Sequence, residues 1–215
     1  MLYPFLMSNK DTYHRRIIEE FSPFSETYDQ YVGQGIPFCN TSIKFNAVNV
    51  LIDLIQRKST LKSIHTVLDL GTGTGLFAQA LKNIDQSLSI VGVDLTLDMV
   101  KKAQDKKIMD AIVCADLTQD FSFATNSFDM TSISSVFEFL EGFYQHTIDE
   151  MLRVTKPNGT IAISAIKSEE LTIRDYLKQH AQIIDYKDDD GYVVTKDSVS
   201  ESTPYEFILA RVNPT

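Results

Sequence analysis

The spacing of hydrophobic residues changes near residue 67. The stretch 67–70 is a short apolar run containing one acid, Asp69, and alternating glycines follow at Gly71, Gly73 and Gly75. Apolar residues then recur at helical spacing, so the pattern predicts a strand, a tight turn and a helix. Glycine suits such a turn because it adopts positive φ and lets backbone N–H groups and a helix N-terminus approach a ligand closely. The stretch therefore predicts a small-molecule site.

Beyond the glycine turn, strand-like runs alternate with helical patterns. One helix is predicted to begin near Thr96, a second to include Tyr144 and Ile148, and a third to run from Ser168 to about His180. Strands that alternate with helices predict an α/β fold, a parallel sheet with helices on both faces. The expected strands of its parallel part are 67–70, 89–93, 111–114, 128–134 and 160–166.

The C-terminal part departs from this alternation. Residues 191–196 and 205–212 look extended, and only 197–204 lie between them, which predicts an antiparallel hairpin at the edge of a mostly parallel, seven-stranded sheet. The run 188–191 reads Asp-Asp-Asp-Gly and suggests a calcium loop. Because the twelfth position of that loop would be Asp197 rather than Glu, a solvated turn is favoured.

The N-terminal segment 1–42 mixes aromatic residues with proline and glycine and shows no sustained period. Aromatic side chains bury large areas, so we expect an irregular or partly helical cover that packs over the rest of the chain. From Ile43 a helical pattern begins, with Asn40, Thr41 or Ser42 as its N-cap. The expected division is a lid at 1–42 and a domain at 43–215.

Composition and charge narrow the class of protein. The chain has 215 residues, which favours one domain, and its net charge of −9 argues against a nucleic-acid partner. No signal peptide is expected, and no run approaches the length of a membrane span, so we expect no membrane partner. Cys39 and Cys114 are predicted to be reduced thiols in a cytoplasmic protein. The oligomeric state is left open.

Spacing separates the ligand classes that use a strand, a glycine turn and a helix. A phosphate-binding P-loop is excluded, because Leu76 stands where Gly-Lys should begin. A dinucleotide turn needs glycine or alanine at that same position, while here the third glycine comes one residue early at Gly75, which disfavours NAD without excluding it. The remaining class is S-adenosylmethionine, a nucleoside ligand without a pyrophosphate.

Five motifs in order carry a family resemblance. They are V-L-D-L-G-T-G-T-G from Val67, V-G-V-D-L ending at Leu95, C-A-D-L at 114–117, N-S-F-D-M at 126–130 and L-R-V-T-K-P-N-G-T at 152–160. The chain resembles a class I S-adenosylmethionine-dependent methyltransferase, nearest the small-molecule group called type 11, from roughly Asp69 to Ala165. The resemblance implies a Rossmann-like fold and S-adenosylmethionine as the cofactor.

The resemblance also implies roles for individual residues. Asp94 matches the acid that accepts hydrogen bonds from the ribose hydroxyls, although it is also placed to cap a helix. Asp116 and Leu117 match the pair that recognises adenine, with an ordinary loop acid as the alternative for Asp116. Leu95 is expected to cover the adenine and Ser134 to lie near the reactive methyl. The full set expected to bind the cofactor, including the turn beside the methionine head group, is Asp69, Gly71, Thr72, Gly73, Gly75, Asp94, Leu95, Asp116, Leu117 and Ser134.

Catalytic residues are harder to assign, because a sulfonium donor is already activated and the protein mainly aligns the acceptor and excludes water. Glu138 falls where many relatives carry a polar residue that faces the acceptor, and a solvated acid at a helix start is the alternative. Tyr28 resembles a lid tyrosine that lines the cofactor pocket, with a packed aromatic as the alternative.

No cluster of residues has metal-ligand spacing, so no metal is expected. We expect solvated or capping roles for the scattered histidines, which are His14, His65, His146 and His180.

Missing motifs and the N-terminal segment bear on the methyl acceptor. After 128–134 there is no Asn/Asp-Pro-Pro-Tyr and no Pro-Cys, which again disfavours a nucleic-acid substrate. The segments 21–22 and 28–31 resemble the malonyl-carrier-protein carboxyl methyltransferases and, more faintly, the quinone-ring methyltransferases. We therefore expect a small-molecule or carrier-bound acceptor. The alternatives are an inactive S-adenosylmethionine-binding protein of the same fold and an NAD-dependent oxidoreductase.

Overall fold

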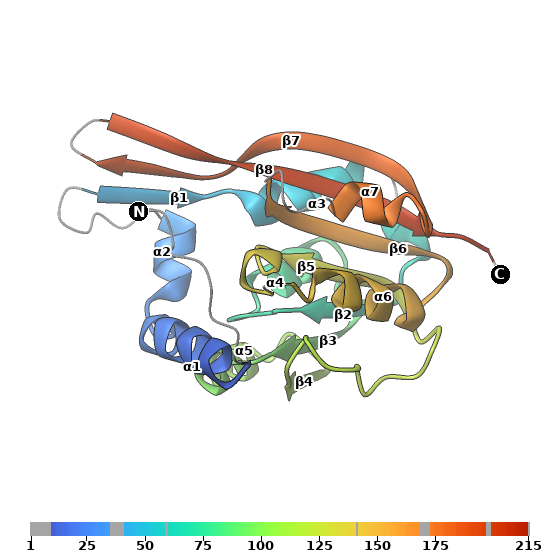
Figure 1. The fold of residues 1–215 in the computed structure, drawn as a ribbon, viewed down its shortest axis with the longest axis horizontal. Helices are drawn as coiled ribbons and strands as arrows, with labels where there is room; N and C mark the ends of the chain where they lie inside the picture. The colour runs from blue at the N-terminus through green and yellow to red at the C-terminus, as the bar shows by residue number, and fades with distance from the viewer. Residues whose placement is uncertain are drawn as a thin grey trace.

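The computed structural model describes residues 10–34, 41–58, 60–140, 142–167, 173–196 and 199–214. Within these residues one eight-stranded sheet runs in the order β1-β7-β8-β6-β5-β2-β3-β4, with helices packed against it (Figure 1). The strands are β1 (Thr41–Phe45), β2 (Thr66–Leu70), β3 (Ser89–Asp94), β4 (Ala111–Cys114), β5 (Phe128–Ser134), β6 (Thr155–Ile166), β7 (Ala181–Lys196) and β8 (Val199–Val212).

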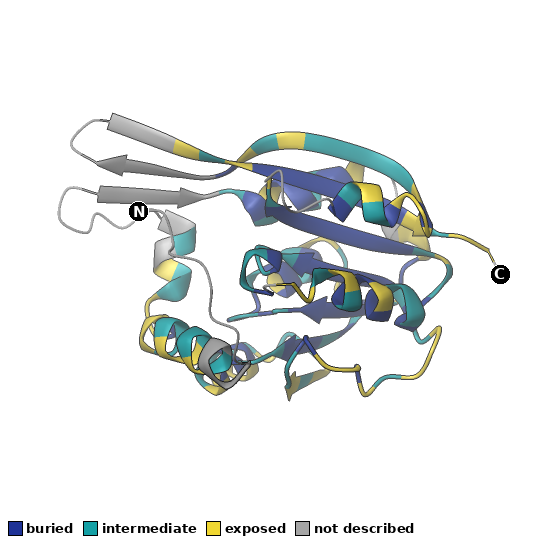
Figure 2. Cartoon of the chain, in the orientation of Figure 1, coloured by how far each residue is buried: buried dark blue, intermediate teal, exposed yellow. Residues whose placement is uncertain are grey.

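The five strands from β6 to β4 are parallel, as the alternating pattern predicts. Because β2, β5 and β6 are covered on both faces, their middle residues are buried whichever way they point, whereas the edge strand β4 is largely exposed (Figure 2). Leu68 and Leu70 belong to one core cluster, with residues of α6 and α7, and Val67 belongs to a second cluster, with residues of α3 and α4. The helices of the domain are α3 (Ala47–Arg57), α4 (Leu76–Ile84), α5 (Leu97–Asp105), α6 (Tyr144–Val154) and α7 (Ile173–Leu177). Part of the predicted helix at 168–180 lies outside the described residues.

The C-terminal hairpin is confirmed, since β7 and β8 pair antiparallel and β8 joins the sheet beside β6. Its strands are longer than predicted. Val199–Pro204 belongs to β8 rather than to a loop, and Asp188–Asp190 lies within β7 and pairs with β8, so the predicted solvated turn is wrong. Ion pairs stabilise acids in this strand, because Lys167 Nζ lies 2.6 Å from Asp188 Oδ2.

The N-terminal segment is partly helical, as predicted, and its helices lie beside the parallel part of the sheet (Figure 1). The predicted N-cap at 40–42 is wrong. Thr41–Phe45 forms β1, which pairs with Tyr192–Lys196 of β7, and Asn46 directly precedes α3. This added strand makes the sheet eight-stranded rather than seven-stranded. The segment's helical elements are α1 (Lys10–Phe21), η1 (Ser22–Phe24) and α2 (Tyr28–Gln34).

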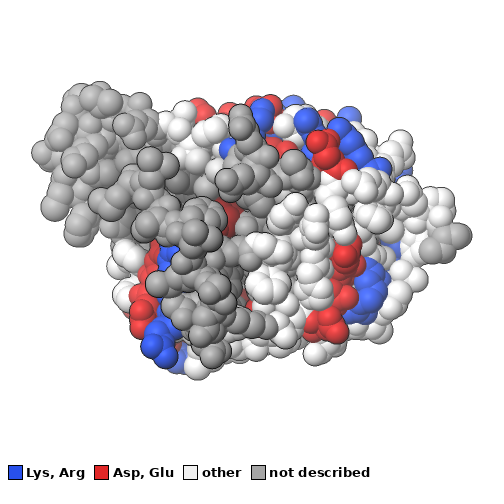
Figure 3. Space-filling model, viewed as in Figure 1, with Lys and Arg blue, Asp and Glu red and all other residues white. Residues whose placement is uncertain are grey.

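Two surface properties limit the kinds of contact the described residues offer. No helix among them is long and apolar enough to cross a bilayer. On the face shown in Figure 3, basic side chains of the described surface lie beside acidic ones instead of gathering into one patch. Ion pairs among the described residues include Arg153 with Glu150 and Lys178 with Asp175.

Candidate active site

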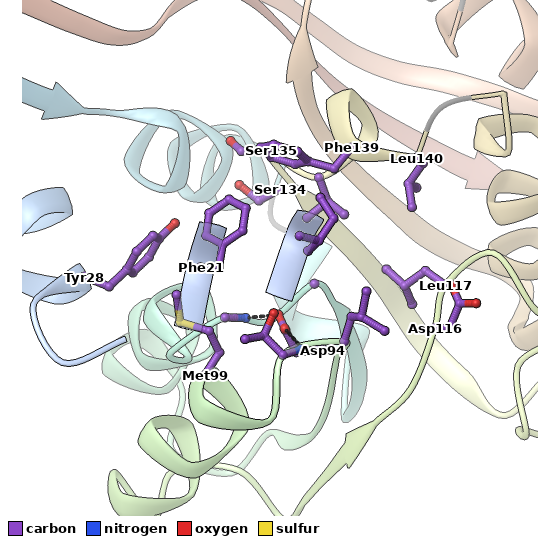
Figure 4. A pocket seen from close by; sticks show the side chains of 16 residues that line it. Phe21, Tyr28, Asp94, Met99, Asp116, Leu117, Ser134, Ser135, Phe139 and Leu140 are labelled. Carbon is purple, nitrogen blue, oxygen red and sulfur yellow. Dashed lines mark hydrogen bonds between the residues drawn. The ribbon is translucent and has the colours of Figure 1, made fainter. Parts of the chain in front are cut away.

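A cavity opens where β2, β3 and β5 end, between these strand ends and the helices of the N-terminal segment (Figure 4). In open parallel sheets ligands bind at this edge, because the loops after the strands diverge there. The cavity and the open solvent at its mouth together occupy about 680 Å³. Its walls are formed by Ile17, Phe21, Tyr28, Gly71, Gly73, Asp94, Leu95, Thr96, Met99, Asp116, Leu117, Ser134, Ser135, Val136, Phe139 and Leu140.

The glycine turn connects β2 to α4 with the backbone geometry that the sequence predicts. Gly71, Gly73 and Gly75 all have positive φ, at 64°, 55° and 87°. A Cβ on Gly71 would stand 2.3 Å from Cγ2 of Val136, so the turn needs glycine there to pack. A Cβ on Gly73 would meet nothing within 4 Å. Because Gly73 lines the cavity, that open space is available to a ligand.

Asp94 ends β3 and joins two of the expected site segments. Its Oδ2 accepts a hydrogen bond from the Gly73 N–H (2.8 Å), and its Oδ1 accepts one from the Thr96 N–H (2.8 Å). Burial raises the pKa of Asp94, although both backbone hydrogen bonds oppose this effect. The carboxylate therefore accepts a hydrogen bond at the start of α5, as predicted for a helix-capping acid. It also lines the cavity (Figure 4). Each oxygen retains capacity for a second hydrogen bond.

Asp69 and Thr72 lie outside the lining of the cavity. Thr72 Oγ1 donates to Asp69 Oδ2 (2.6 Å), and Ser132 Oγ donates to Asp69 Oδ1 (2.9 Å). Burial raises the pKa of Asp69 to about 6. Both side chains thus hold the glycine turn from within the protein, and their contact with a cofactor stays a prediction. Gly75, which precedes α4, also lies outside the lining.

Asp116 and Leu117 follow β4 and line the cavity, as does Leu95. Asp116 Oδ1 accepts hydrogen bonds from the Thr118 N–H (2.8 Å) and Oγ1 (2.7 Å), which fix the carboxylate. The other carboxylate oxygen, Asp116 Oδ2, lies 3.0 Å from Nε2 of His14, a residue of α1. The expectation of a solvated or capping role for His14 is therefore wrong, because packing of α1 over the cavity places the imidazole against this acid.

The N-terminal helices form one wall of the cavity through Ile17, Phe21 and Tyr28. The ring of Phe21 packs edge-on against Phe139, with 5.2 Å between ring centroids. Polar contacts hold this wall in place. Ser22 Oγ donates to Asp98 Oδ2 of α5 (2.8 Å).

Asp29 anchors the same wall to the glycine turn and to α5. Its Oδ1 accepts a hydrogen bond from Thr74 Oγ1, and its Oδ2 lies 2.6 Å from Nζ of Lys106. Thr74 belongs to the glycine turn, so the helical cover and the predicted cofactor segment are directly connected.

The end of β5 supplies the remaining wall. Ser134 Oγ shares a 2.8 Å hydrogen bond with Ser164 Oγ of β6. Ser135 takes up positive φ of 57°, which costs energy for a residue with a Cβ and is common at functional sites. Its Oγ is buried without a hydrogen-bond partner among the described residues. Ser135 thus offers a cavity ligand an unused polar group.

Glu138 lies in the short helix η3 (Phe137–Phe139), just behind this wall. Its Oε1 accepts a hydrogen bond from the Tyr205 hydroxyl of β8 (2.9 Å), while its Oε2 is buried and has no partner among the described residues. Burial raises the pKa of Glu138 to about 7. Burial, followed by the charges of Asp94 and Glu138, raises the pKa of Tyr28 to about 12. Tyr28 lines the cavity and Glu138 does not.

Several lining residues have no counterpart in the sequence-based set. The abundance of aromatics before residue 42 was a signal for Phe21, but nothing marked the others, because they carry no motif. These residues are Ile17, Phe21, Thr96, Met99, Ser135, Val136, Phe139 and Leu140. In the described part of the chain, no group of three or more His, Cys, Asp or Glu side chains is placed to hold a metal ion.

Comparison with known proteins links this site to a family. Residues 68–163 match the family described as methyltransferase domain. A demethylmenaquinone methyltransferase of Corynebacterium urealyticum is 31% identical over 62% of this chain and 55% of its own length. A malonyl-[acyl-carrier protein] O-methyltransferase of Buchnera aphidicola is 26% identical over 71% of this chain and 55% of its own length. The chain thus spans about half the length of these relatives.

A solved structure extends the likeness in fold over almost the whole chain. The magnesium protoporphyrin IX methyltransferase of Synechocystis PCC 6803, solved with bound SAM, superposes with a TM-score of 0.69 and 14% identity. The match covers 97% of this chain and 100% of that one. At this identity the likeness concerns the fold alone.

Proposed function

We propose that the chain is a class I S-adenosylmethionine-dependent methyltransferase, which transfers a methyl group from S-adenosylmethionine to a small-molecule or carrier-bound acceptor. The match of residues 68–163 to a methyltransferase domain supports this proposal. The observation that carries the proposal is the position of Asp94. Its carboxylate lines the cavity and is held against the N–H of Gly73, where the open space beside a glycine with positive φ accommodates a ligand.

The residues present fit this cofactor. Asp94 would accept hydrogen bonds from the ribose hydroxyls with its remaining lone pairs, and Asp116 would accept one from the adenine amino group between Leu95 and Leu117. The backbone at Gly73 would approach the methionine head group. The cofactor supplies an activated methyl group on a sulfonium. The chain's own residues would bind it, align the acceptor with it and exclude water.

The two relatives named above differ in acceptor class. One is named for a demethylated menaquinone and the other for a malonyl group on a carrier protein. What they have in common is the methyl transfer, so the acceptor of this chain is proposed only as a metabolite or a carrier-bound group.

Thermal unfolding with separate additions of S-adenosylmethionine, S-adenosylhomocysteine and NAD tests the cofactor. A ligand at about a hundred times its Kd stabilises a protein by roughly 2.7 kcal/mol, which for a chain of this size raises Tm by about 5 to 11 °C. We expect this shift with the two adenosyl ligands and none with NAD. A shift with NAD alone would contradict the proposal. Binding of the adenosyl ligands without methyl transfer to a panel of metabolites would favour an inactive protein of the same fold.

A further inference from the structure

The wall of the cavity beside β5, together with η3 directly behind it, contains two buried oxygen atoms that no described residue satisfies. Ser135 Oγ and Glu138 Oε2 are both buried without a hydrogen-bond partner. Buried polar atoms are nearly always hydrogen-bonded in folded proteins, because desolvation is costly otherwise. Two unpaired oxygens only three positions apart in one segment therefore indicate a place where a bound molecule supplies the missing partners.

Glu138 lies between residues that form the cavity wall. Val136 and Phe139 line the cavity on either side of it along the chain, and its charge contributes to the raised pKa of Tyr28, which lines the cavity from the N-terminal segment. The hydroxyl of Tyr205 fixes the carboxylate through Oε1 and leaves Oε2 unused. Tyr205 is itself only 1% exposed, so this pair is a fixed part of the fold.

The charge of the cavity disfavours an anionic acceptor. The described lining residues include the acids Asp94 and Asp116 but no Lys or Arg. A carboxylate acceptor would be desolvated beside these acids without a cationic side chain in the described lining, which is costly. Much of the remaining wall is apolar, with Ile17, Phe21, Phe139 and Leu140 among its residues. Such a wall suits an apolar ring whose polar group is neutral when it binds.

We propose that Glu138 is a catalytic base for an acceptor with a phenol- or enol-type hydroxyl on an apolar ring, and that Tyr205 is the residue that positions it. This inference rests on the proposed function. The hydroxyl proton passes to Glu138 Oε2 and later to water. The electron pair left on the oxygen, or delocalised onto the adjacent ring carbon, forms the bond to the methyl carbon. The bond from that carbon to sulfur breaks, and its electron pair remains on sulfur as a neutral thioether.

The pH dependence of methyl transfer tests this proposal. The probes are 1,4-dihydroxynaphthalene under anaerobic conditions and a malonyl thioester, each with S-adenosylmethionine. We expect transfer to the naphthalene diol only, with kcat/KM rising through an apparent pKa near 7. Glu138→Gln should lower kcat/KM by about 10²- to 10⁴-fold and abolish this rise, while cofactor affinity stays unchanged.

Tyr205→Phe separates a positioning role from a merely structural one. The hydrogen bond from Tyr205 lowers the pKa of Glu138, so its loss should move the kinetic pKa upward by about one unit. Tyr176→Phe is the matched control, because the half-buried Tyr176 also donates to a carboxylate (Asp149 Oδ1, 2.8 Å) but is not among the residues that line the cavity. It should leave the profile unchanged.

The outcomes distinguish the inference from the function on which it rests. If the protein does not bind S-adenosylmethionine, the proposed function fails. If it binds the cofactor but methylates only the malonyl thioester, or neither probe, the inference is overturned. An unchanged pH profile in Glu138→Gln, or equal profiles of Tyr205→Phe and the wild type, would overturn it as well.

Discussion

The two ends of the cavity differ in how completely the protein satisfies its own polar groups. At the proposed cofactor end, formed by Gly71, Gly73, Asp94 and Asp116, each carboxylate accepts hydrogen bonds from nearby backbone N–H groups. At the proposed acceptor end, Ser135 and Tyr28 line the cavity and Glu138 lies behind the wall. Here Ser135 Oγ and Glu138 Oε2 have no partner among the described residues.

Under the proposed function, this difference separates two tasks. Carboxylates that the fold already holds in position suit a ligand that is the same in every reaction, such as the cofactor. Little reorganisation of the protein is then needed on binding. Unpaired groups are unfavourable in the free protein and gain a partner only with a matching acceptor, which gives selectivity. We therefore expect changes at the cofactor end to alter affinity for S-adenosylmethionine, and changes at the acceptor end to alter stability and turnover without altering that affinity.

The largest expected effect concerns the buried charge at the acceptor end. The carboxyl of Glu138 ionises near 4.5 in the unfolded chain and at about 7 in the folded protein, so the folded state binds more protons between these values. Its contribution to the free energy of unfolding therefore falls as pH rises from about 5 to 7. Glu138→Gln removes this dependence. The free energy of unfolding of the variant, measured relative to that of the wild type, should therefore increase by up to about 3 kcal/mol between pH 5 and pH 8.

Urea unfolding of both proteins across this pH range measures the effect, and the difference between them cancels other titrating groups such as Asp69 and Glu206. A constant difference at all pH values would show that the folded protein does not hold Glu138 in a desolvated position, and the contrast between the two ends would disappear.

At the cofactor end, Asp94→Ala should weaken binding of S-adenosylmethionine by roughly 1.5 to 3 kcal/mol, which is about 10- to 150-fold in Kd. The reason is the loss of a charge-assisted hydrogen bond to the ligand. Isothermal titration calorimetry measures the affinity, and the Tm of the free protein controls for the lost bonds to Gly73 and Thr96. Equal affinity in a folded variant would mean that another residue binds the ribose.

Gly71 and Gly73 provide a matched pair of variants that tests whether the open space beside Gly73 is used by the cofactor. Gly71 and Gly73 both have positive φ, so an added Cβ costs each about 1 to 2 kcal/mol of backbone strain. Gly71→Ala also collides with Val136, whereas the Cβ of Gly73→Ala projects into open space. We expect thermal unfolding to show the greater loss of stability in Gly71→Ala. Gly73→Ala should lose cofactor affinity with a smaller loss of stability, and equal stability losses in the two variants would count against this assignment.

The smallest effect concerns the strained wall of the acceptor end. Ser135→Gly removes the strain of a positive φ and also removes an unpaired oxygen. Glycine costs additional backbone entropy on folding, so the net increase in the free energy of unfolding should be about 1 kcal/mol. Ser135→Ala keeps the strain and serves as the control. Affinity for S-adenosylmethionine should be unchanged in both. Destabilisation by Ser135→Gly would show that the hydroxyl is already satisfied.

Local patterns predicted the strand, turn and helix at the proposed cofactor end. The apolar run at 67–70 and the alternating glycines predict the strand, the turn and its positive φ, because these depend on residues adjacent in sequence. Asp94 and Asp116 lie at the cavity because parallel strands bring their ends to one edge of the sheet. Asp69 shows the limit of this reasoning, since the motif marks it but the structure places both its oxygens against Thr72 and Ser132.

By itself the sequence determined the parallel core, the glycine turn and the acids at the ends of β3 and β4, since periodicity and turn chemistry act over a few residues. Only the tertiary structure decided that Thr41–Phe45 forms a strand with β7, that His14 faces Asp116, and that Tyr205 holds Glu138. Each of these contacts joins segments far apart in the chain. Long-range packing sets them, and no local pattern in either partner encodes the other.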